Sequence, residues 1–247
     1  MSVEIRRDGA VCVLQLRREE KLNALSSALE RALQDALASD AVRSSACVVL
    51  TGSGRAFSAG ADISEFAERT PEAVAAYYRD TGAVYEQVAA LPQPTLSAIH
   101  GWCLGGGLEL ALATDFRISD ASAVFGFPEV GLGILPSSGG THRVARLLGA
   151  ARARELILLR ERLTAEEALE AGLVTEVVPE GTALERALDH ARRLAALPPL
   201  AVALTKQAID AAADGSRESA LLIERLAYGL LAQTAAARDA AEGFGCR

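Results

Sequence analysis

Short apolar runs, each bounded by glycine or by charged residues, recur along the first half of the chain. Such runs, rich in valine, leucine and isoleucine, are typical of buried β-strands. The pattern therefore predicts strands over residues 11–16, 47–50, 95–99, 116–119 and 123–125. Two of these strands run into loops that are rich in glycine and other small residues.

Segments with apolar residues at helical spacing lie between these strands. Ser26 or Ser27 caps the first of them. A long helix is predicted over residues 71–91, because Pro92 and Pro94 would end it. Further helices are predicted over residues 108–113, from about Thr141, and through most of the chain after Ala183. Strands that alternate with helices predict an α/β core in which helices cover parallel sheets, followed by a helical tail.

Composition and charge narrow the class of protein. The chain has 247 residues, 50% of them hydrophobic and 4% aromatic, so it can bury a substantial core of small aliphatic side chains. Its net charge of −7 and its scattered arginines disfavour nucleic-acid binding, which usually needs a concentrated basic surface. The N-terminus lacks a signal-peptide pattern, and no apolar run approaches the roughly 20 residues that span a bilayer. We expect a cytoplasmic protein that binds neither nucleic acid nor a membrane.

The cysteines and histidines show no spacing typical of metal ligands. Cys12, Cys47, Cys103 and Cys246 form no CxxC motif, and three of them lie in apolar segments that predict reduced, buried thiols. The three histidines stand apart in the sequence, at positions 100, 142 and 190. We therefore expect no metal site.

The two glycine-rich loops after apolar strands make nucleotide binding the first function to test. A dinucleotide fingerprint would need glycine where Phe57 and Cys103 stand. No GxxxxGK[ST] phosphate loop is present. A serine-hydrolase GxSxG motif around Ser58 would need glycine at Ala56. The spacing therefore excludes these three kinds of site.

Two turns of small residues remain in these loops, at residues 58–62 and 105–107. Small residues let a ligand approach the main chain closely, and the start of a helix leaves N–H donors unpaired. Two such donors that converge on one point would form an oxyanion hole. Close packing alone also explains either turn, and that alternative stays open.

Glu109 and Glu129 both lie in apolar surroundings. Glu109 follows the triple glycine at the start of a helix, where the helix dipole alone would favour a glutamate. Glu129 could equally be a solvated loop residue. If the fold brings the two together, burial would shift their pKa values and make them an acid/base pair.

Four motifs stand in order along the chain: Lys21-Leu-Asn-Ala-Leu, Ala56-Phe-Ser-Ala-Gly-Ala-Asp-Ile, Gly101-Trp-Cys-Leu-Gly-Gly-Gly-Leu-Glu-Leu and Phe127-Pro-Glu-Val-Gly-Leu-Gly-Ile-Leu-Pro-Ser-Ser-Gly-Gly-Thr. In this order and spacing they closely resemble the enoyl-CoA hydratase/isomerase (crotonase) family, and the similarity covers most of the chain. The resemblance implies an α/β fold, a crotonase-like spiral of repeated ββα units with a C-terminal helical trimerisation region. We expect a catalytic core over residues 1–195 and a helical oligomerisation region over residues 196–247.

The resemblance also implies roles for individual residues. The main-chain N–H groups of Ala61 and Gly106 match the oxyanion hole that holds the thioester carbonyl of a CoA substrate. Glu109 matches the glutamate that orients and deprotonates water, and Glu129 matches the one that exchanges a proton with the substrate α-carbon. The segments that cradle the adenine and pantetheine parts of CoA match at Leu22, Ala24, Ala59, Asp62 and Ile63.

With both glutamate positions filled, the implied reaction is the reversible addition of water across the 2,3-double bond of an enoyl-CoA thioester, giving a 3-hydroxyacyl-CoA. Coenzyme A is part of this substrate, so no separate cofactor is expected. The implied assembly is a homotrimer or homohexamer. The alternatives are an isomerase that moves a double bond between the 3,4 and 2,3 positions, another acyl-CoA enzyme of the family, and a non-catalytic scaffold.

Details of the chain indicate how the substrate would be held. Tyr77, Tyr78 and Tyr85 of the segment 71–91 are expected to shape the acyl pocket. Ser64 stands where hydratases often carry a lysine that meets a CoA phosphate, and relatives usually continue further after the Glu242-Gly243 pair. The first departure implies a weaker contact with the CoA phosphate, and the second implies altered CoA affinity or altered assembly.

Overall fold

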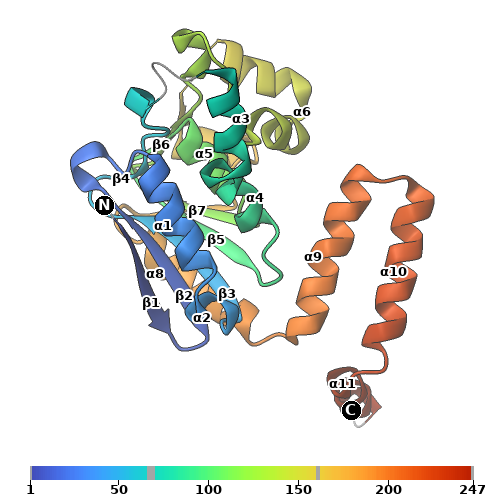
Figure 1. The fold of residues 1–247 in the computed structure, drawn as a ribbon. Helices are drawn as coiled ribbons and strands as arrows, with labels where there is room; N and C mark the ends of the chain where they lie inside the picture. Colours follow the sequence, from blue (N-terminus) through green and yellow to red (C-terminus); the bar gives the residue numbers. More distant parts are fainter. Residues whose placement is uncertain (1, 66–69, 160–161, 246–247) are drawn as a thin grey trace.

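The computed structural model, which describes residues 2–65, 70–159 and 162–245, has two β-sheets. The larger sheet has the order β1 (Ser2–Asp8), β2 (Val11–Arg17), β3 (Cys47–Gly52), β5 (Thr95–Ile99), β7 (Phe116–Asp120) and β10 (Glu176–Val178). The smaller has the order β4 (Ala56–Ser58), β6 (Trp102–Leu104), β8 (Val124–Gly126) and β9 (Leu163–Thr164). Each apolar run identified in the sequence forms one of these strands (Figure 1).

Consecutive strands are divided between the two sheets, which produces a repeated ββα unit. β3 and β4 precede the helices α3 (Pro71–Arg79) and α4 (Val84–Ala89), β5 and β6 precede α5 (Gly106–Leu112), and β7 and β8 precede α6 (Gly140–Leu158). The first strand of each unit joins the larger sheet and the second joins the smaller. Equivalent strands of successive units pair in parallel, so the units stack as a spiral. The expected α/β spiral is confirmed.

Both faces of the larger sheet are covered by helices. Leu14 of β2 belongs to the core cluster that contains Leu29 of α1 (Ser27–Leu37). Val13, on the opposite face of the same strand, belongs to the cluster that contains Ala187 of α8 (Ala183–Ala195). Successive side chains of a strand point to opposite faces, so a strand covered on both sides is apolar throughout. This explains why the central strands were visible in the sequence as continuous apolar runs.

The N-terminal strand β1 was not anticipated from the sequence. It pairs antiparallel with β2, from Ser2 opposite Arg17 to Asp8 opposite Val11. β1 lies at the edge of the sheet, and most of its residues are exposed or half-buried. An edge strand of this kind alternates polar with apolar residues and therefore lacks the continuous apolar run of a central strand.

The single helix predicted over residues 71–91 is wrong, because α3 and α4 are separate helices. A 3-10 turn, η3 (Thr81–Ala83), lies between them, and Asp80 has φ −106° and ψ −107°, outside the helical region. Gly82 lies against the ring of Tyr77, and a Cβ at Gly82 would stand 2.8 Å from Tyr77 Cε1. Glycine is a weak helix former, and here it lets the aromatic ring pack onto the turn.

The other predicted helices form close to where the sequence pattern placed them, whereas α2 (Asp40–Arg43) and α7 (Ala165–Glu170) were not predicted. Ser26 caps α1, because its Oγ accepts a hydrogen bond from Leu29 N at 3.3 Å. α6 begins at Gly140 and is bent at Gly149, whose φ of 80° and ψ of 157° are not helical. The remaining helices are α9 (Pro199–Asp214), α10 (Arg217–Leu231) and α11 (Ala235–Gly245).

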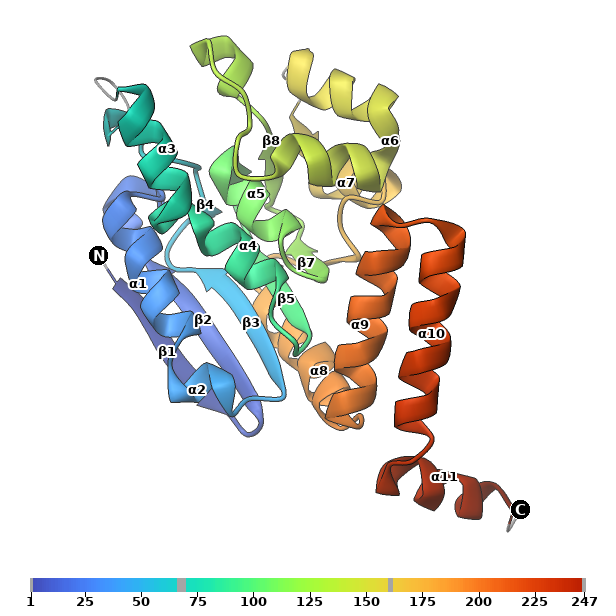
Figure 2. The same cartoon turned by 45° about the vertical axis from the view of Figure 1, so that its right-hand side comes forward.

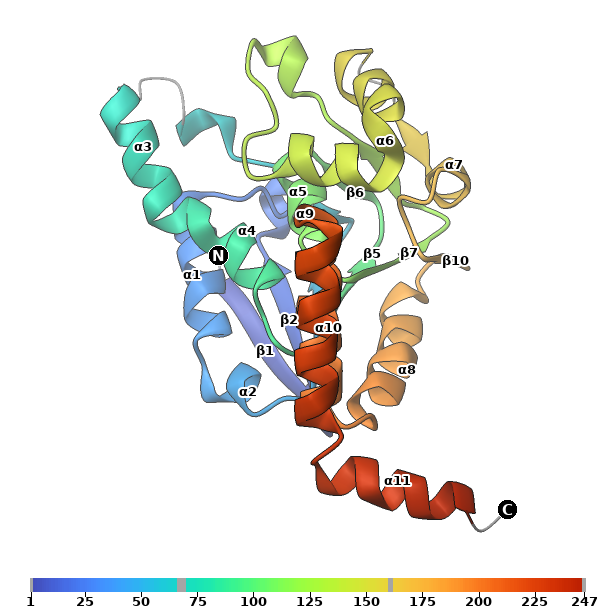
Figure 3. The ribbon, with the colours of Figure 1, turned by 90° about the vertical axis from the view of Figure 1, so that its right-hand side faces the viewer.

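The C-terminal helices stand apart from the two sheets. α9 and α10 form a hairpin beside the body of the molecule, and α11 continues away from it (Figures 2 and 3). No residue of α9 or α10 is buried, although both helices carry large apolar side chains. Among the described residues, no helix is both long enough and apolar enough to cross a membrane.

Three of the four cysteines are buried free thiols, as their apolar surroundings predicted. These are Cys12, Cys47 and Cys103, and burial raises the pKa of Cys47 to about 12. Cys246 lies outside the described residues. Within the part of the chain that the structure describes, no three His, Cys, Asp or Glu side chains are grouped so that they could hold a metal ion.

Candidate functional site

Three parallel strands of the smaller sheet, β4, β6 and β8, end at one edge. Residues 59–61 follow β4, residues 105–109 follow β6, and residues 127–129 follow β8. The carboxyl ends of parallel strands lie together, so these segments meet although they are far apart in the sequence. Ala61, Gly106, Glu109 and Glu129 all come from these three segments.

The turns after β4 and β6 approach each other through glycine. A Cβ at Gly107 would stand 2.5 Å from the carbonyl oxygen of Ser58, and one at Gly60 would stand 2.8 Å from that of Leu104. A Cβ at Gly106 would stand 3.2 Å from the backbone nitrogen of Ala61. Gly106 is the first residue of α5, where a helix leaves its N–H groups without intrahelical partners. Close packing and adjacent N–H donors are therefore two consequences of the same contact.

A cavity of about 280 Å³ opens at this edge. Its lining includes five of the residues expected to act in catalysis or to bind coenzyme A: Ala61, Ile63, Gly106, Glu109 and Glu129. Leu132, Ile134 and Leu135 form an apolar side of the cavity. The two carboxyl groups therefore share one largely apolar space, which sequence alone could not establish.

Glu109 is fixed in the first turn of α5 by the main chain of another segment. It is 4% exposed, and its Oε1 accepts hydrogen bonds from Ser138 N at 2.7 Å and from Gly140 N at 2.8 Å. Burial raises the pKa of Glu109, while these two hydrogen bonds and the nearby Arg143 act in the opposite direction. Because both bonds use Oε1, the second carboxyl oxygen remains able to bind a water molecule or a substrate atom.

Glu129 begins the 3-10 turn η4 (Glu129–Leu132) and is 8% exposed. Its Oε2 is buried and has no hydrogen-bond partner among the described residues. Burial, with a further contribution from the charge of Glu109, raises the pKa of Glu129 to about 7. A carboxyl group with this pKa exchanges a proton readily near neutral pH.

Ile63 reaches the cavity, but the other four residues expected to hold coenzyme A do not line it. The carbonyl oxygen of Leu22 accepts a hydrogen bond from Ala59 N at 2.9 Å, which ties these two segments together. Asp62 forms an ion pair with Arg18 at 2.7 Å, and hydrogen bonds from Ser64 and Arg18 lower its pKa. Ala24 is half-buried and its carbonyl oxygen accepts from Arg18 at 3.0 Å.

Residues to which the sequence analysis gave no role complete the site. Ser138 and Gly140 hold Glu109 through backbone N–H groups, so their side chains gave no signal of this role. A Cβ at Gly140 would stand 2.8 Å from Glu109 Oε1, which leaves room there only for glycine.

Tyr77, Tyr78 and Tyr85 line the cavity, as expected. Glu30, which accepts from two of these tyrosines, was also missed.

The shared cavity predicts a specific titration of Glu129. The side-chain carboxyl of Glu129 should titrate near pH 7, and the Glu109→Gln substitution should lower this midpoint because it removes a neighbouring negative charge. Carbon-13 NMR of labelled glutamate side chains measures the Glu129 midpoint in the wild-type protein and in the Glu109→Gln variant. Glu72→Gln, the same change at an exposed position of α3, should leave the midpoint unchanged. An ordinary midpoint of about 4.3 for Glu129 would contradict the burial described here.

The sequence model of the enoyl-CoA hydratase/isomerase family matches residues 6–245 of the chain. The 2,3-dehydroadipyl-CoA hydratase of Escherichia coli is 38% identical over 232 residues, which cover 93% of this chain and 90% of that protein. The short-chain-enoyl-CoA hydratase of Clostridium acetobutylicum is 36% identical over 245 residues, or 98% and 94% of the two chains.

A solved structure shows the same similarity in three dimensions. The crystal structure of an enoyl-CoA hydratase from Bacillus anthracis superimposes with a TM-score of 0.92 at 38% sequence identity. The match covers 99% of this chain and 96% of that one. The spiral core and the C-terminal helices are therefore both within the range of the match.

Proposed function

The chain belongs to the enoyl-CoA hydratase/isomerase family, and we propose that within this family it is a hydratase that adds water reversibly to a 2-enoyl-CoA. The observation that carries the proposal is that two buried glutamates, Glu109 and Glu129, line one cavity. Hydration needs one group that deprotonates the attacking water and another that exchanges a proton with the α-carbon. The names of the relatives give independent support.

The thioester carbonyl oxygen would bind between the main-chain N–H groups of Ala61 and Gly106. Addition of water to carbon 3 places negative charge on this oxygen, and fixed donors stabilise that charge as it develops. Loss of one such donor typically lowers the rate by about 10²–10³-fold. Backbone near Leu22, Ala24, Ala59, Asp62 and Ile63 would hold the coenzyme A part, which belongs to the substrate, so the reaction requires no separate cofactor.

The two glutamates would divide the proton transfers. Glu109 would orient the water and take a proton from it as the water oxygen bonds to carbon 3. Glu129, whose pKa of about 7 lets it carry a proton at neutral pH, would deliver one to carbon 2. The sum of the two steps adds one water molecule across the double bond. The reverse sequence eliminates it, which accounts for a reversible reaction.

An isomerase is the main alternative, because moving a double bond between the 3,4 and 2,3 positions requires only one well-placed carboxyl group. The second buried glutamate favours the hydratase. A non-catalytic scaffold is less consistent with two carboxyl groups that are held in an apolar cavity, because burying them costs free energy that packing alone does not require.

The proposal predicts how each glutamate affects turnover. The wild-type protein should remove the ultraviolet absorbance of crotonyl-CoA, because hydration destroys the conjugated chromophore. Glu109→Gln and Glu129→Gln should each lower the rate by roughly 10²–10⁴-fold, the usual contribution of a general acid or base. Glu72→Gln, at an exposed position of α3, should retain the wild-type rate.

The same assay distinguishes the alternatives. If crotonyl-CoA is stable while a 3-enoyl-CoA gains the conjugated absorbance, and only Glu129→Gln stops this, the protein is an isomerase. If both classes of thioester are unchanged by the wild-type protein, the catalytic proposal is wrong and the scaffold alternative is favoured.

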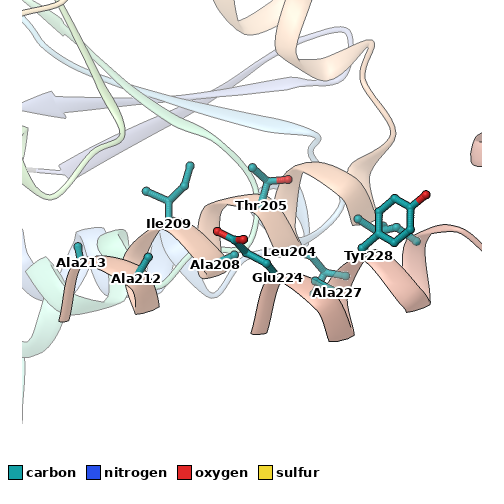
Figure 4. A pocket seen from close by; sticks show the side chains of 10 residues that line it. Leu204, Thr205, Ala208, Ile209, Ala212, Ala213, Glu224, Ala227 and Tyr228 are labelled. Carbon is teal, nitrogen blue, oxygen red and sulfur yellow. The ribbon is translucent and has the colours of Figure 1, made fainter. Parts of the chain in front are cut away.

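We propose that the chain assembles into a homotrimer or homohexamer through its C-terminal helices. A groove of about 580 Å³ lies between α9 and α10, with Ala208, Ile209 and Ala227 among its lining residues (Figure 4). Leu222 and Leu226 of α10 are 55% and 62% exposed. Apolar surface of this extent is usually covered in an assembly, and further copies of this chain would cover it.

Assembly predicts a solution mass of three or six times 25.8 kDa, which light scattering after gel filtration measures directly. Leu226→Glu should reduce this mass, because it places a charge within the exposed apolar face of α10. Ile5→Glu, at a 38% exposed position of the edge strand β1, should leave the mass unchanged. A wild-type monomer at micromolar concentration would refute the assembly.

A further inference from the structure

Glu30 is a buried carboxyl group that the proposed hydration does not use. It lies on α1 and is 1% exposed. Its Oε1 accepts hydrogen bonds from Tyr77 Oη at 2.6 Å and from Tyr85 Oη at 3.1 Å. Both tyrosines line the cavity that holds Glu109 and Glu129. Each of these tyrosines therefore links the third carboxyl group to the cavity in which the acyl chain would bind.

Tyr77 anchors one wall of the cavity. It is the one buried residue of α3, and the residue that follows this helix, Asp80, also contacts α1. Besides the bond from Tyr77 to Glu30, Gln34 donates to the carbonyl oxygen of Asp80 at 2.8 Å, and Arg31 pairs with the Asp80 carboxylate at 2.9 Å. The position of the wall therefore depends on α1.

Tyr85 lies next to the reacting centre. It is 1% exposed, and a Cβ at Gly106 would stand 3.2 Å from its hydroxyl oxygen. Burial and the adjacent Glu30 carboxylate raise the pKa of Tyr85, so the hydroxyl group stays protonated and donates a hydrogen bond to Glu30. The hydroxyl group is therefore committed to Glu30 and does not offer its hydrogen to a substrate.

Three carboxyl groups lie in the cavity or directly behind its tyrosines. Glu109 and Glu129 line it, and Glu30 stands behind the tyrosines. Burial raises the pKa of Glu30 to about 6, so this group is ionised at pH 8. Arg143 of α6, whose charge acts on Glu109, is paired with Glu86 at 2.6 Å. A negatively charged acyl group would therefore meet charge of its own sign.

We propose, on the basis of the hydratase function proposed above, that Glu30 is a positioning residue that selects substrates with an uncharged acyl group over those ending in a carboxylate. Glu30 acts in two ways. It occupies the hydroxyl hydrogens of Tyr77 and Tyr85, which would otherwise donate to a carboxylate at the end of the acyl chain. Its own charge also repels that carboxylate across a largely apolar cavity, where charges interact more strongly than in bulk water.

Two substrates of equal length test this selection. 2-Hexenoyl-CoA and 2,3-dehydroadipyl-CoA both carry six-carbon acyl groups and differ at carbon 6, which is a methyl group or a carboxylate. At pH 8 the wild-type protein should show a kcat/KM about tenfold or more higher for 2-hexenoyl-CoA. Glu30→Gln keeps the shape of the side chain without its charge and should narrow this ratio about tenfold, mainly through the KM for 2,3-dehydroadipyl-CoA.

Three features of the design separate selection from general damage. Each ratio is taken within one variant, so a uniform loss of activity cancels. Glu72→Gln removes the same charge from an exposed position of α3 and should keep the wild-type ratio. Tyr85→Phe keeps the Glu30 charge and should keep or widen the ratio, whereas a merely structural role of the cluster would affect Tyr85→Phe and Glu30→Gln alike.

Equilibrium binding keeps this test independent of turnover. Calorimetry should show that the wild-type protein binds hexanoyl-CoA more tightly than adipyl-CoA and that Glu30→Gln reduces this difference in affinity.

The outcomes distinguish the two proposals. Absence of hydration together with this binding preference would refute the hydratase function but retain the role of Glu30 in selection. Equal affinities in the wild type, or an unchanged ratio in folded Glu30→Gln, would overturn the inference. If Glu30→Gln does not fold, loss of the preference in Tyr85→Phe would overturn it.

Discussion

The close approach of the turns after β4 and β6 is the constraint on which the rest of the site depends. Gly60 and Gly107 bring one main chain against the other at distances that a Cβ would not allow. This contact places the N–H groups of Ala61 and Gly106 side by side and fixes the start of α5. The position of Glu109 in the first turn of α5 follows directly from it.

Burial of charge is the second physical theme of the site. Glu109 and Glu129 are brought into an apolar cavity, which costs free energy but raises their pKa values toward the range useful for proton transfer. Two backbone N–H groups hold Glu109, whereas one oxygen of Glu129 has no partner among the described residues. The first carboxyl group is therefore fixed in place, and the second retains an oxygen atom that is free to accept or release a proton.

The sequence predicted the central strands, the cap of α1 and the candidate glutamates because these depend on local pattern or on motifs of the family. It did not predict the edge strand β1, whose polar residues face solvent, or the turn at Gly82, which depends on the ring of Tyr77. The hydrogen bonds from Ser138 and Gly140 come from the main chain, so no side chain signals them. Glu30 looked like an ordinary helix residue, because its burial depends on two tyrosines about 50 residues away.

The central claim is that the residues following β4, β6 and β8 bind one thioester substrate together. A crystal structure with bound hexanoyl-CoA tests it most directly. The account predicts that the thioester oxygen lies roughly 2.7–3.2 Å from both Ala61 N and Gly106 N, with the acyl chain between Glu109 and Glu129. A thioester bound away from these two nitrogen atoms, or an acyl chain outside the cavity, would contradict the claim.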